Sequence, residues 1–310
     1  MVRSFIVSLS LTWLFGGCSP EPTILKGETM GTFYSVTIEG HDLDSPTLHK
    51  AVKRRLDELE QCFSNWRDDS AVSQWNRSTS IDFQPVPWEI AEVVSIALKA
   101  ARETEGALDI TVAPLIDLWG FGPHKHDHSP NDAEIAEARS HCGWEKLTVQ
   151  LDPPMLRKSD PLLTINLSTL VEGYASDTIA DLVQSMGHDQ VLVDVGGAIN
   201  ARGKTWNIAV QTPYASTGQS MTTVPLLDHA VTTAGTYRKR LQHQGKSISH
   251  IIDPRTGRPV DHSLISVSVF APSAAIADGY DTALLVLGPK HGRDLAQKLR
   301  IKALFIEEAK

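Results

Sequence analysis

Two aspartates and a threonine are grouped in one short apolar stretch, Ala277-Asp278-Gly279-Tyr280-Asp281-Thr282. If this stretch is helical, Asp278 and Thr282 are four residues apart and share one face, with Asp281 beside them. Carboxylates on an apolar helix are costly to bury without a partner. A hard cation such as Mg²⁺ would be one, because it prefers oxygen ligands and often bridges substrate phosphates. The alternative is structural: an aspartate favoured by the helix dipole, with the threonine bonded back to a carbonyl.

His250 is the second candidate for chemistry. It lies in the run Ser249 to Pro259, where a strand passes into a turn fixed by Asp-Pro and Thr-Gly. It is the sole group on this strand that ordinarily titrates near neutrality, so it could act as a general base, or it could be structural. The tract His124 to His128 resembles a zinc site, but its Pro, Gly and Ser neighbours favour a solvated loop.

The whole composition is that of an ordinary globular protein. The chain has 310 residues, 41% hydrophobic and 21% charged, with a formal net charge of −8. Collagen, coiled coil, long disorder and polytopic membrane protein are therefore excluded as classes. Lys and Arg form no dense cluster, so we expect no nucleic-acid partner. Three cysteines are too few for a disulfide scaffold.

The N-terminus predicts export. A basic start precedes the apolar run Phe5 to Phe15, which is too short to span a bilayer, and Gly16-Gly17-Cys18 follows. We expect a lipoprotein signal peptide over residues 1–17, lipidation of Cys18, a tether over 18–28 and one domain over 29–310. The alternative is a plain cleaved signal with an incidental cysteine. The protein would then face the periplasm or exterior from a bacterial membrane, where Cys62 and Cys142 could pair or stay free.

Helices cluster early in the chain and strands late, which predicts an α+β fold with a mostly antiparallel sheet. Hydrophobic periodicity and glycine caps predict helices over 46–64, 87–105, 131–141, 170–186 and 273–287, followed by a basic helix. Alternating runs between turn residues predict strands over 32–38, 191–195, 206–211, 222–226, 230–233, 247–252, 265–270 and 303–306. No linker separates two domains.

Taken in order, several segments resemble one family. They are Met30-Gly31-Thr32, Phe63 to Asn76, Ala107 to Leu115, Leu118 to Gly122, Asn166 to Ala175, Val193-Asp194-Val195-Gly196-Gly197, Thr233 to Tyr237, His250 to Pro259 and Ala277 to Gly288. The chain resembles the FAD:protein FMN transferases, the flavin transferase (ApbE) family, over about residues 29–290. The resemblance implies a single T-fold-like domain.

The resemblance also implies a reaction and its residues. FMN would pass from FAD, held with Mg²⁺, to a Thr or Ser hydroxyl of an acceptor flavoprotein in a membrane or periplasmic redox complex, releasing AMP. The FAD site would be lined by Met30, Trp66, Ala107, Leu108, Asp109, Asn166, Glu172 and Ile252. The metal would be surrounded by Thr169, Asp278, Asp281 and Thr282. His250 would deprotonate the acceptor hydroxyl, and Met30 with Trp66 would provide an apolar wall for the flavin ring.

The sequence departs from the family pattern at four positions. Asn166 stands where many relatives have Asp, and Glu172 where many have Lys; Ala198 and Ala234 replace a common Glu or Asn and a frequent Ser. None of these removes a proposed metal ligand, although Asn166 makes a charged contact with FAD neutral. Two alternatives stay open: an FAD pyrophosphatase that forms FMN and AMP, and a non-catalytic FAD-binding lipoprotein.

Overall fold

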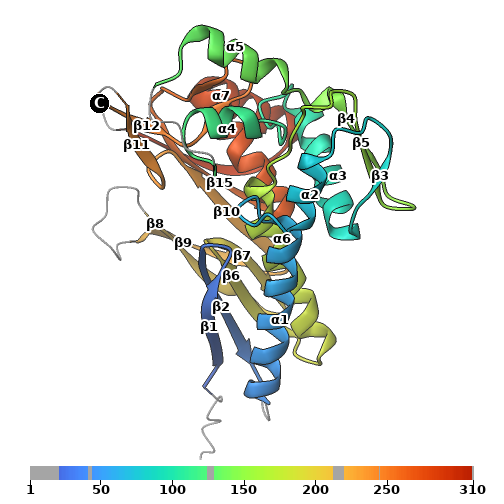
Figure 1. Cartoon of the computed structure of the whole chain (residues 1–310). Helices are drawn as coiled ribbons and strands as arrows, with labels where there is room; N and C mark the ends of the chain where they lie inside the picture. Colours follow the sequence, from blue (N-terminus) through green and yellow to red (C-terminus); the bar gives the residue numbers. More distant parts are fainter. Residues whose placement is uncertain (1–20, 41–43, 124–128, 212–219, 244, 309–310) are drawn as a thin grey trace, which may run out of the picture.

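A seven-stranded antiparallel sheet forms the centre of the structure (Figure 1). The computed structural model describes residues 21–40, 44–123, 129–211, 220–243 and 245–308. In spatial order the strands are β1 (Thr23–Thr29), β2 (Thr32–Glu39), β6 (Gln190–Val195), β7 (Ala198–Arg202), β10 (His229–Gly235), β15 (Leu264–Ala271) and β16 (Lys302–Glu307). Every neighbouring pair is antiparallel, as expected from the late strands of the sequence.

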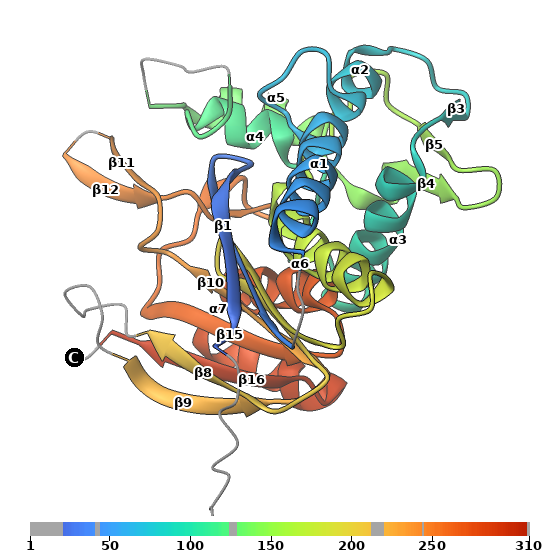
Figure 2. The same cartoon turned by 90° about the horizontal axis from the view of Figure 1, so that it is seen from below.

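Helices cover one face of this sheet (Figures 1 and 2). The helices are α1 (Ser45–Phe63), α2 (Ala71–Arg77), α3 (Trp88–Glu103), α4 (Ala113–Leu118), α5 (Asp132–Ser140), α6 (Ser168–Ser185) and α7 (Ala274–Leu299), with a 3-10 turn at Trp144–Lys146. Because side chains alternate along a strand, Val191, Val193 and Val195 of β6 all face this helical layer. None of the helices in the described ranges is both long and apolar enough to cross a membrane.

Four small sheets surround this centre. They are β3 (Gln84–Pro85) with β5 (Met155–Lys158) and β4 (Leu147–Gln150), β8 (Trp206–Gln211) with β9 (Ser220–Leu226), β11 (Arg240–His243) with β12 (Lys246–Ser249), and β13 (Ile252–Asp253) with β14 (Arg258–Pro259). The β8–β9 hairpin packs on the opposite face of the large sheet, where Trp206, Ile208 and Leu226 join Ala201 and Val231 in a separate core. Both faces of the sheet are thus covered.

The predicted helices and the α+β class are confirmed, with three corrections. Residues 23–28, expected to belong to a tether, form most of β1, which pairs with β2 from Thr23 to Thr29. The strand predicted over 247–252 is divided at His250 into β12 and β13. The two helices predicted after residue 273 form one element, α7, which bends at Gly288, where φ is 77°. The signal peptide, Cys18 and the histidine tract at 124–128 lie outside the described residues.

Candidate active site

Helices α6 and α7 cross at very close range, and this crossing assembles the acidic part of the site. A Cβ atom on Gly173 would lie 2.5 Å from the carbonyl oxygen of Ala274, so only glycine allows the approach. At the crossing, the backbone N–H of Gly173 donates to Asp278 Oδ2 at 2.9 Å. Asp177 of α6 holds the start of α7, accepting from Ala274 N at 2.8 Å and Ala275 N at 3.0 Å. Both helices are therefore fixed next to the aspartate pair.

One carboxyl oxygen of the aspartate pair forms no hydrogen bond within the described residues. Asp281 is 1% exposed, and its Oδ1 accepts from the Thr282 hydroxyl at 3.2 Å. Its Oδ2 and the hydroxyl of Thr232 are both buried, and the hydroxyl is near enough to lower the pKa of Asp281, but neither atom forms a hydrogen bond of normal length and angle within the described residues. Burial raises the pKa of Asp281 to about 7. Burial, Asp281 and Glu172 together raise the pKa of Asp278 well above its ordinary value.

This arrangement fits a hard cation. The buried Asp281 and the half-buried Asp278 both resist ionisation, and together with the unbonded Oδ2 of Asp281 between α7 and β10 they have the chemistry of an oxygen-ligand metal site. Within the described part of the chain, no group of three His, Cys, Asp or Glu side chains is placed to hold a metal. The set would therefore need hydroxyl or carbonyl oxygens, such as those of Thr282 and Thr169, and oxygens from water or substrate.

The turn between β6 and β7 lies against Glu172. Gly196 and Gly197 have φ values of 60° and 97°, which L side chains rarely adopt. A Cβ on Gly196 would lie 2.5 Å from the Glu172 carboxyl carbon. Burial raises the pKa of Glu172, and the positive charges of Arg238 and Lys239 lower it. The glycine pair therefore allows the Glu172 carboxyl to pack directly against this turn.

His250 is held as a neutral imidazole with one nitrogen open for base chemistry. Its Nδ1 lies 3.1 Å from the carbonyl oxygen of Lys239. Because a carbonyl only accepts, Nδ1 carries the proton and Nε2 has the free lone pair. Burial lowers the pKa of His250 to about 4, and the charges of Lys239 and Arg238 contribute. The ring of Phe121 meets the imidazole edge-on, with centroids 6.2 Å apart.

Two residues of the expected flavin wall lie near the end of α1. Met30 has a φ of 51° in the β1–β2 turn, and its N–H donates to Glu60 Oε2 at 3.3 Å. This left-handed conformation is unusual for methionine, and such strain is typical of functional positions. Trp66 follows the helix and is 66% exposed, an unusual state for a large aromatic side chain. Both are available to a flat apolar ligand.

Other expected FAD-site residues have side chains that serve the fold. Both carboxylate oxygens of Asp109 are occupied, Oδ1 by Thr111 at 2.7 and 2.8 Å and Oδ2 by Trp144 N at 3.0 Å. Ala107 and Leu108 are buried, and Leu108 faces Gly279 of α7. Ile252 is buried in a smaller core cluster together with Leu115 and Trp119. The carboxylate of Asp109 thus already ties Thr111 and Trp144 together, and Oδ2 accepts one hydrogen bond only.

The loop from Ser159 to Leu167 presents Asn166 and Thr169 at the start of α6, and it is firmly anchored. Asn76 accepts from Ile165 N at 2.8 Å and donates to Ile165 O at 2.9 Å, and Asn65 donates to the same oxygen at 3.0 Å. Asn166 N donates to Ile110 O at 2.8 Å, and its Oδ1 accepts from Ser168 N. Three of the motif segments therefore meet at this loop.

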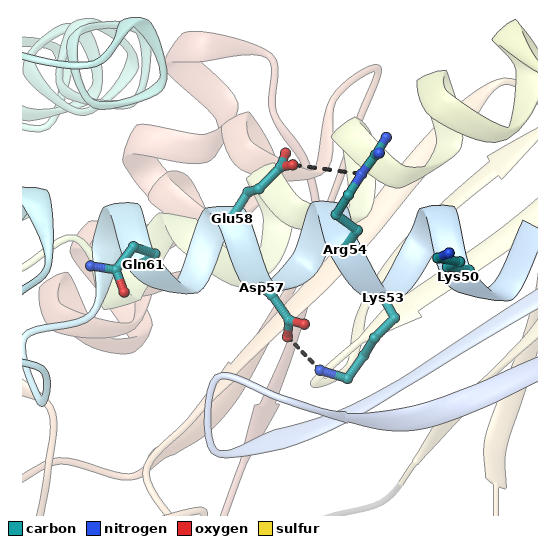
Figure 3. Close-up of a pocket in the computed structure, with 6 residues that line it drawn as sticks. All are labelled: Lys50, Lys53, Arg54, Asp57, Glu58 and Gln61. Carbon is teal, nitrogen blue, oxygen red and sulfur yellow. Dashed lines mark hydrogen bonds and ion pairs between the residues drawn. The ribbon is translucent and has the colours of Figure 1, made fainter.

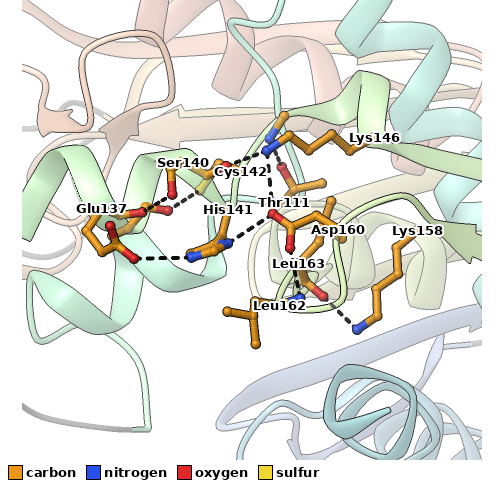
Figure 4. A network of polar contacts seen from close by, with 12 residues as sticks. Thr111, Glu137, Ser140, His141, Cys142, Lys146, Lys158, Asp160, Leu162 and Leu163 are labelled. Atoms are coloured by element: carbon orange, nitrogen blue, oxygen red, sulfur yellow. Dashed lines mark hydrogen bonds and ion pairs between the residues drawn. The ribbon is translucent and has the colours of Figure 1, made fainter. Parts of the chain in front are cut away.

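A second set of contacts holds the beginning of the loop, as Figure 4 shows. His141 Nδ1 lies 2.9 Å from Asp160 Oδ2, and Asp160 Oδ1 accepts from Leu162 N. Lys158, which is fully buried, donates to the carbonyl of Leu163 at 2.9 Å. Its ammonium also lies 4.7 Å from the centre of the Trp75 ring. Burying a lysine is costly, so its hydrogen bond to the Leu163 carbonyl indicates that the backbone of this loop is held in one conformation.

Asn76→Asp should raise the KM for FAD about 10-fold, because a carboxylate cannot donate to Ile165 O and repels it. We expect a smaller change in kcat. The matched control is Gln74→Glu on the same helix, whose amide donates to the Asp69 carbonyl at the surface. Equal KM values for FAD in these two variants would show that the loop does not position a ligand-binding residue.

Other sequence features lie away from this site. A hollow on the outer face of α1, shown in Figure 3, is lined by charged side chains with ion pairs between Lys53 and Asp57 and between Arg54 and Glu58. This pattern is typical of a solvated helix face. Cys62 and Cys142 are both free and buried, and burial raises the pKa of each thiol to about 12. They lie in different core clusters.

In the structure the charges of Asp281 and Glu172 both act on Asp278, so these three carboxyl groups lie close together. The sequence did not indicate the contacts of Arg238 and Asp177, or the role of Asn76 in anchoring the loop before α6. Arg238 directly follows the segment Thr232 to Tyr237, which was noted for its hydroxyl groups. The sequence does not show that the Arg238 side chain reaches Gly196, 42 residues away. The left-handed turn at Met30, the carboxyl pair of Asp278 and Asp281, and the neutral imidazole of His250 lie on one α+β domain. Together they have the features of an enzyme active site.

The chain belongs to the ApbE family, whose model matches residues 30–305. It is 38% identical over 312 residues to an FAD:protein FMN transferase of Escherichia coli K12, covering 94% of this chain and 89% of that protein. The flavin transferase ApbE of Vibrio cholerae has a similar structure, with a TM-score of 0.83, 36% identity and 94% coverage of each chain. The apo flavinyl transferase ApbE of Pseudomonas stutzeri superposes with a TM-score of 0.85 at 32% identity, covering 94% of this chain and 92% of that one.

Proposed function

We propose that this protein transfers FMN from FAD to a Thr or Ser hydroxyl of an acceptor protein and releases AMP. The observation that supports this most directly is the combination, on one ApbE-family domain, of a neutral His250 with the close carboxyl pair of Asp278 and Asp281. Transfer of a phosphoryl group needs a base for the nucleophile and neutralisation of charge on the phosphate oxygens.

His250 would act as the base for the nucleophile. Nε2 would accept the proton of the acceptor hydroxyl, whose oxygen then attacks the phosphorus of the FMN half of FAD. The bond from this phosphorus to the oxygen bridging to AMP breaks, so AMP leaves with that oxygen. The hydrogen bond from Nδ1 to the Lys239 carbonyl keeps the imidazole oriented and stabilises the charge it gains.

Asp278, Asp281, Thr282 and Thr169 would hold Mg²⁺, and the orphaned Oδ2 of Asp281 is the atom that most needs such a partner. When bound, the metal would neutralise charge on the pyrophosphate oxygens. The residues of this chain contribute a rigid frame, because the Gly173–Asp278 hydrogen bond fixes one carboxylate across the helix crossing. On the flavin side, Met30 and Trp66 would contact the ring, and Asn166 and Glu172 would provide polar contacts.

We also propose that the protein works at the bacterial cell envelope. The basic start, the apolar run and Cys18 support a lipid anchor facing the periplasm or exterior. An acceptor there would be a flavoprotein subunit of a membrane or periplasmic redox complex.

One assay tests the activity against both alternatives. The mature protein is incubated with FAD, Mg²⁺ and a candidate acceptor, and AMP, free FMN and in-gel flavin fluorescence of the acceptor are measured. A fluorescent acceptor with equimolar AMP supports transfer. Free FMN with an unlabelled acceptor would indicate a pyrophosphatase, and intact bound FAD would indicate a storage protein.

A further inference from the structure

Arg238 lies in the loop between β10 and β11 and reaches across to the β6–β7 turn. Its Nη1 donates to the carbonyl oxygen of Gly196 at 3.0 Å. A Cβ atom on Gly197 would lie only 2.9 Å from Nη2 of the same guanidinium. Gly196 therefore leaves space for the Glu172 carboxyl, and Gly197 leaves space for the arginine against the same turn.

The guanidinium is held among acidic groups without being neutralised by one. Its positive charge lowers the pKa of Glu172, Asp194, Asp278 and Asp281, so it is close to all four carboxyls. Yet no carboxylate of the described ranges forms an ion pair with Arg238, and its side chain is exposed. Among the residues that the structure describes, one of its five N–H groups is bonded, the one that donates to Gly196.

We propose that Arg238 binds a phosphate oxygen of FAD and stabilises the charge that develops as the bond to AMP breaks. This inference rests on the function proposed above. A dianionic pyrophosphate that approaches four carboxyl groups needs fixed positive charge from the protein as well as any metal. Arginine is always charged, and its planar fork matches phosphate oxygens. The bond to Gly196 orients the fork before the substrate arrives.

The next arginine along the chain, Arg240, makes different contacts. The guanidinium of Arg240 is bonded to Ser247, with Nε 2.7 Å from Oγ and Nη2 2.8 Å from the carbonyl oxygen. It therefore serves the β11–β12 hairpin. Arg240 has the same exposure class as Arg238 and lies two residues further along, which makes it a matched control.

The test compares Arg238→Gln and Arg240→Gln for the binding of FAD and riboflavin at fixed Mg²⁺, followed by flavin fluorescence. Because riboflavin lacks phosphate, Arg238→Gln should weaken FAD binding about 10- to 100-fold and leave riboflavin binding unchanged. Arg240→Gln should change neither, and Arg238→Lys should recover part of the loss.

Three results would overturn the proposal. Unchanged FAD affinity in Arg238→Gln would show that the arginine does not meet a phosphate. Equal weakening of FAD and riboflavin would show that it only supports the shape of the site. Absence of FAD binding in the wild-type protein would overturn the proposed function itself, and this inference with it.

Discussion

Asp278→Asn should reduce AMP release from FAD by at least about 10³-fold, measured at saturating FAD and Mg²⁺. The amide has the shape of the carboxylate, and its oxygen can still accept from Gly173 N, so the crossing of α6 and α7 is kept. Only the negative charge is lost. The expected loss of AMP release therefore measures how much the negative charge of Asp278 contributes to holding the metal and the substrate.

Thermal unfolding separates this role from a structural one. Burial, Asp281 and Glu172 all disfavour a charge on Asp278, so a neutral amide should leave the melting temperature of the metal-free protein equal or higher. Asp294→Asn is the matched control, because Asp294 is an exposed aspartate on the same helix, paired with Lys290. Full AMP release by Asp278→Asn would contradict the metal site assigned here.

The sequence allowed the acidic part of this site to be predicted because helical spacing alone groups Asp278 with Thr282 on one face. Periodicity also located α1, α3, α5 and α6 to within a few residues. β1 was not predicted, since Gly27 and two charged residues interrupt its alternation. That glycine is required because a Cβ there would lie 2.7 Å from the ring of Tyr34 in β2. The glycine is thus explained by a contact between two strands, and the residue pattern within β1 gives no information about that contact.

The same reason explains the functional residues that were missed. Arg238, Asn76 and Asp177 act on residues 42, 89 and 97 positions away in the chain. A single sequence shows residue types and spacing but not which distant carbonyl or N–H a side chain meets. Asp109 shows how much a motif leaves out, because the sequence does not reveal that its carboxylate holds both Thr111 and Trp144.

His250→Asn should lower kcat for transfer by about 10²- to 10⁴-fold with little change in the KM for FAD. The asparagine amide can replace Nδ1–H as donor to the Lys239 carbonyl, so the local structure is kept and only the lone pair of Nε2 is lost. Equal losses in FAD binding and in transfer would instead assign His250 to the binding site. Undiminished transfer would mean that another group is the base.

The pH dependence of transfer tests the state of this base. Because the pKa of His250 is lowered to about 4 from 6.5, the imidazole is neutral at pH 6, and its titration should leave kcat flat from pH 6 to 8. The rate should fall as the pH drops through about 4. Between pH 6.5 and 4 the unfolded chain binds a proton here that the folded one does not, so stability should also decline over this range, less steeply in His250→Asn. Asp281, with a pKa raised to about 7, also titrates in this range, so the profile is compared with that of His250→Asn. A halving of kcat near pH 6.5 that is present in the wild type and absent in His250→Asn would contradict the lowered pKa of the base.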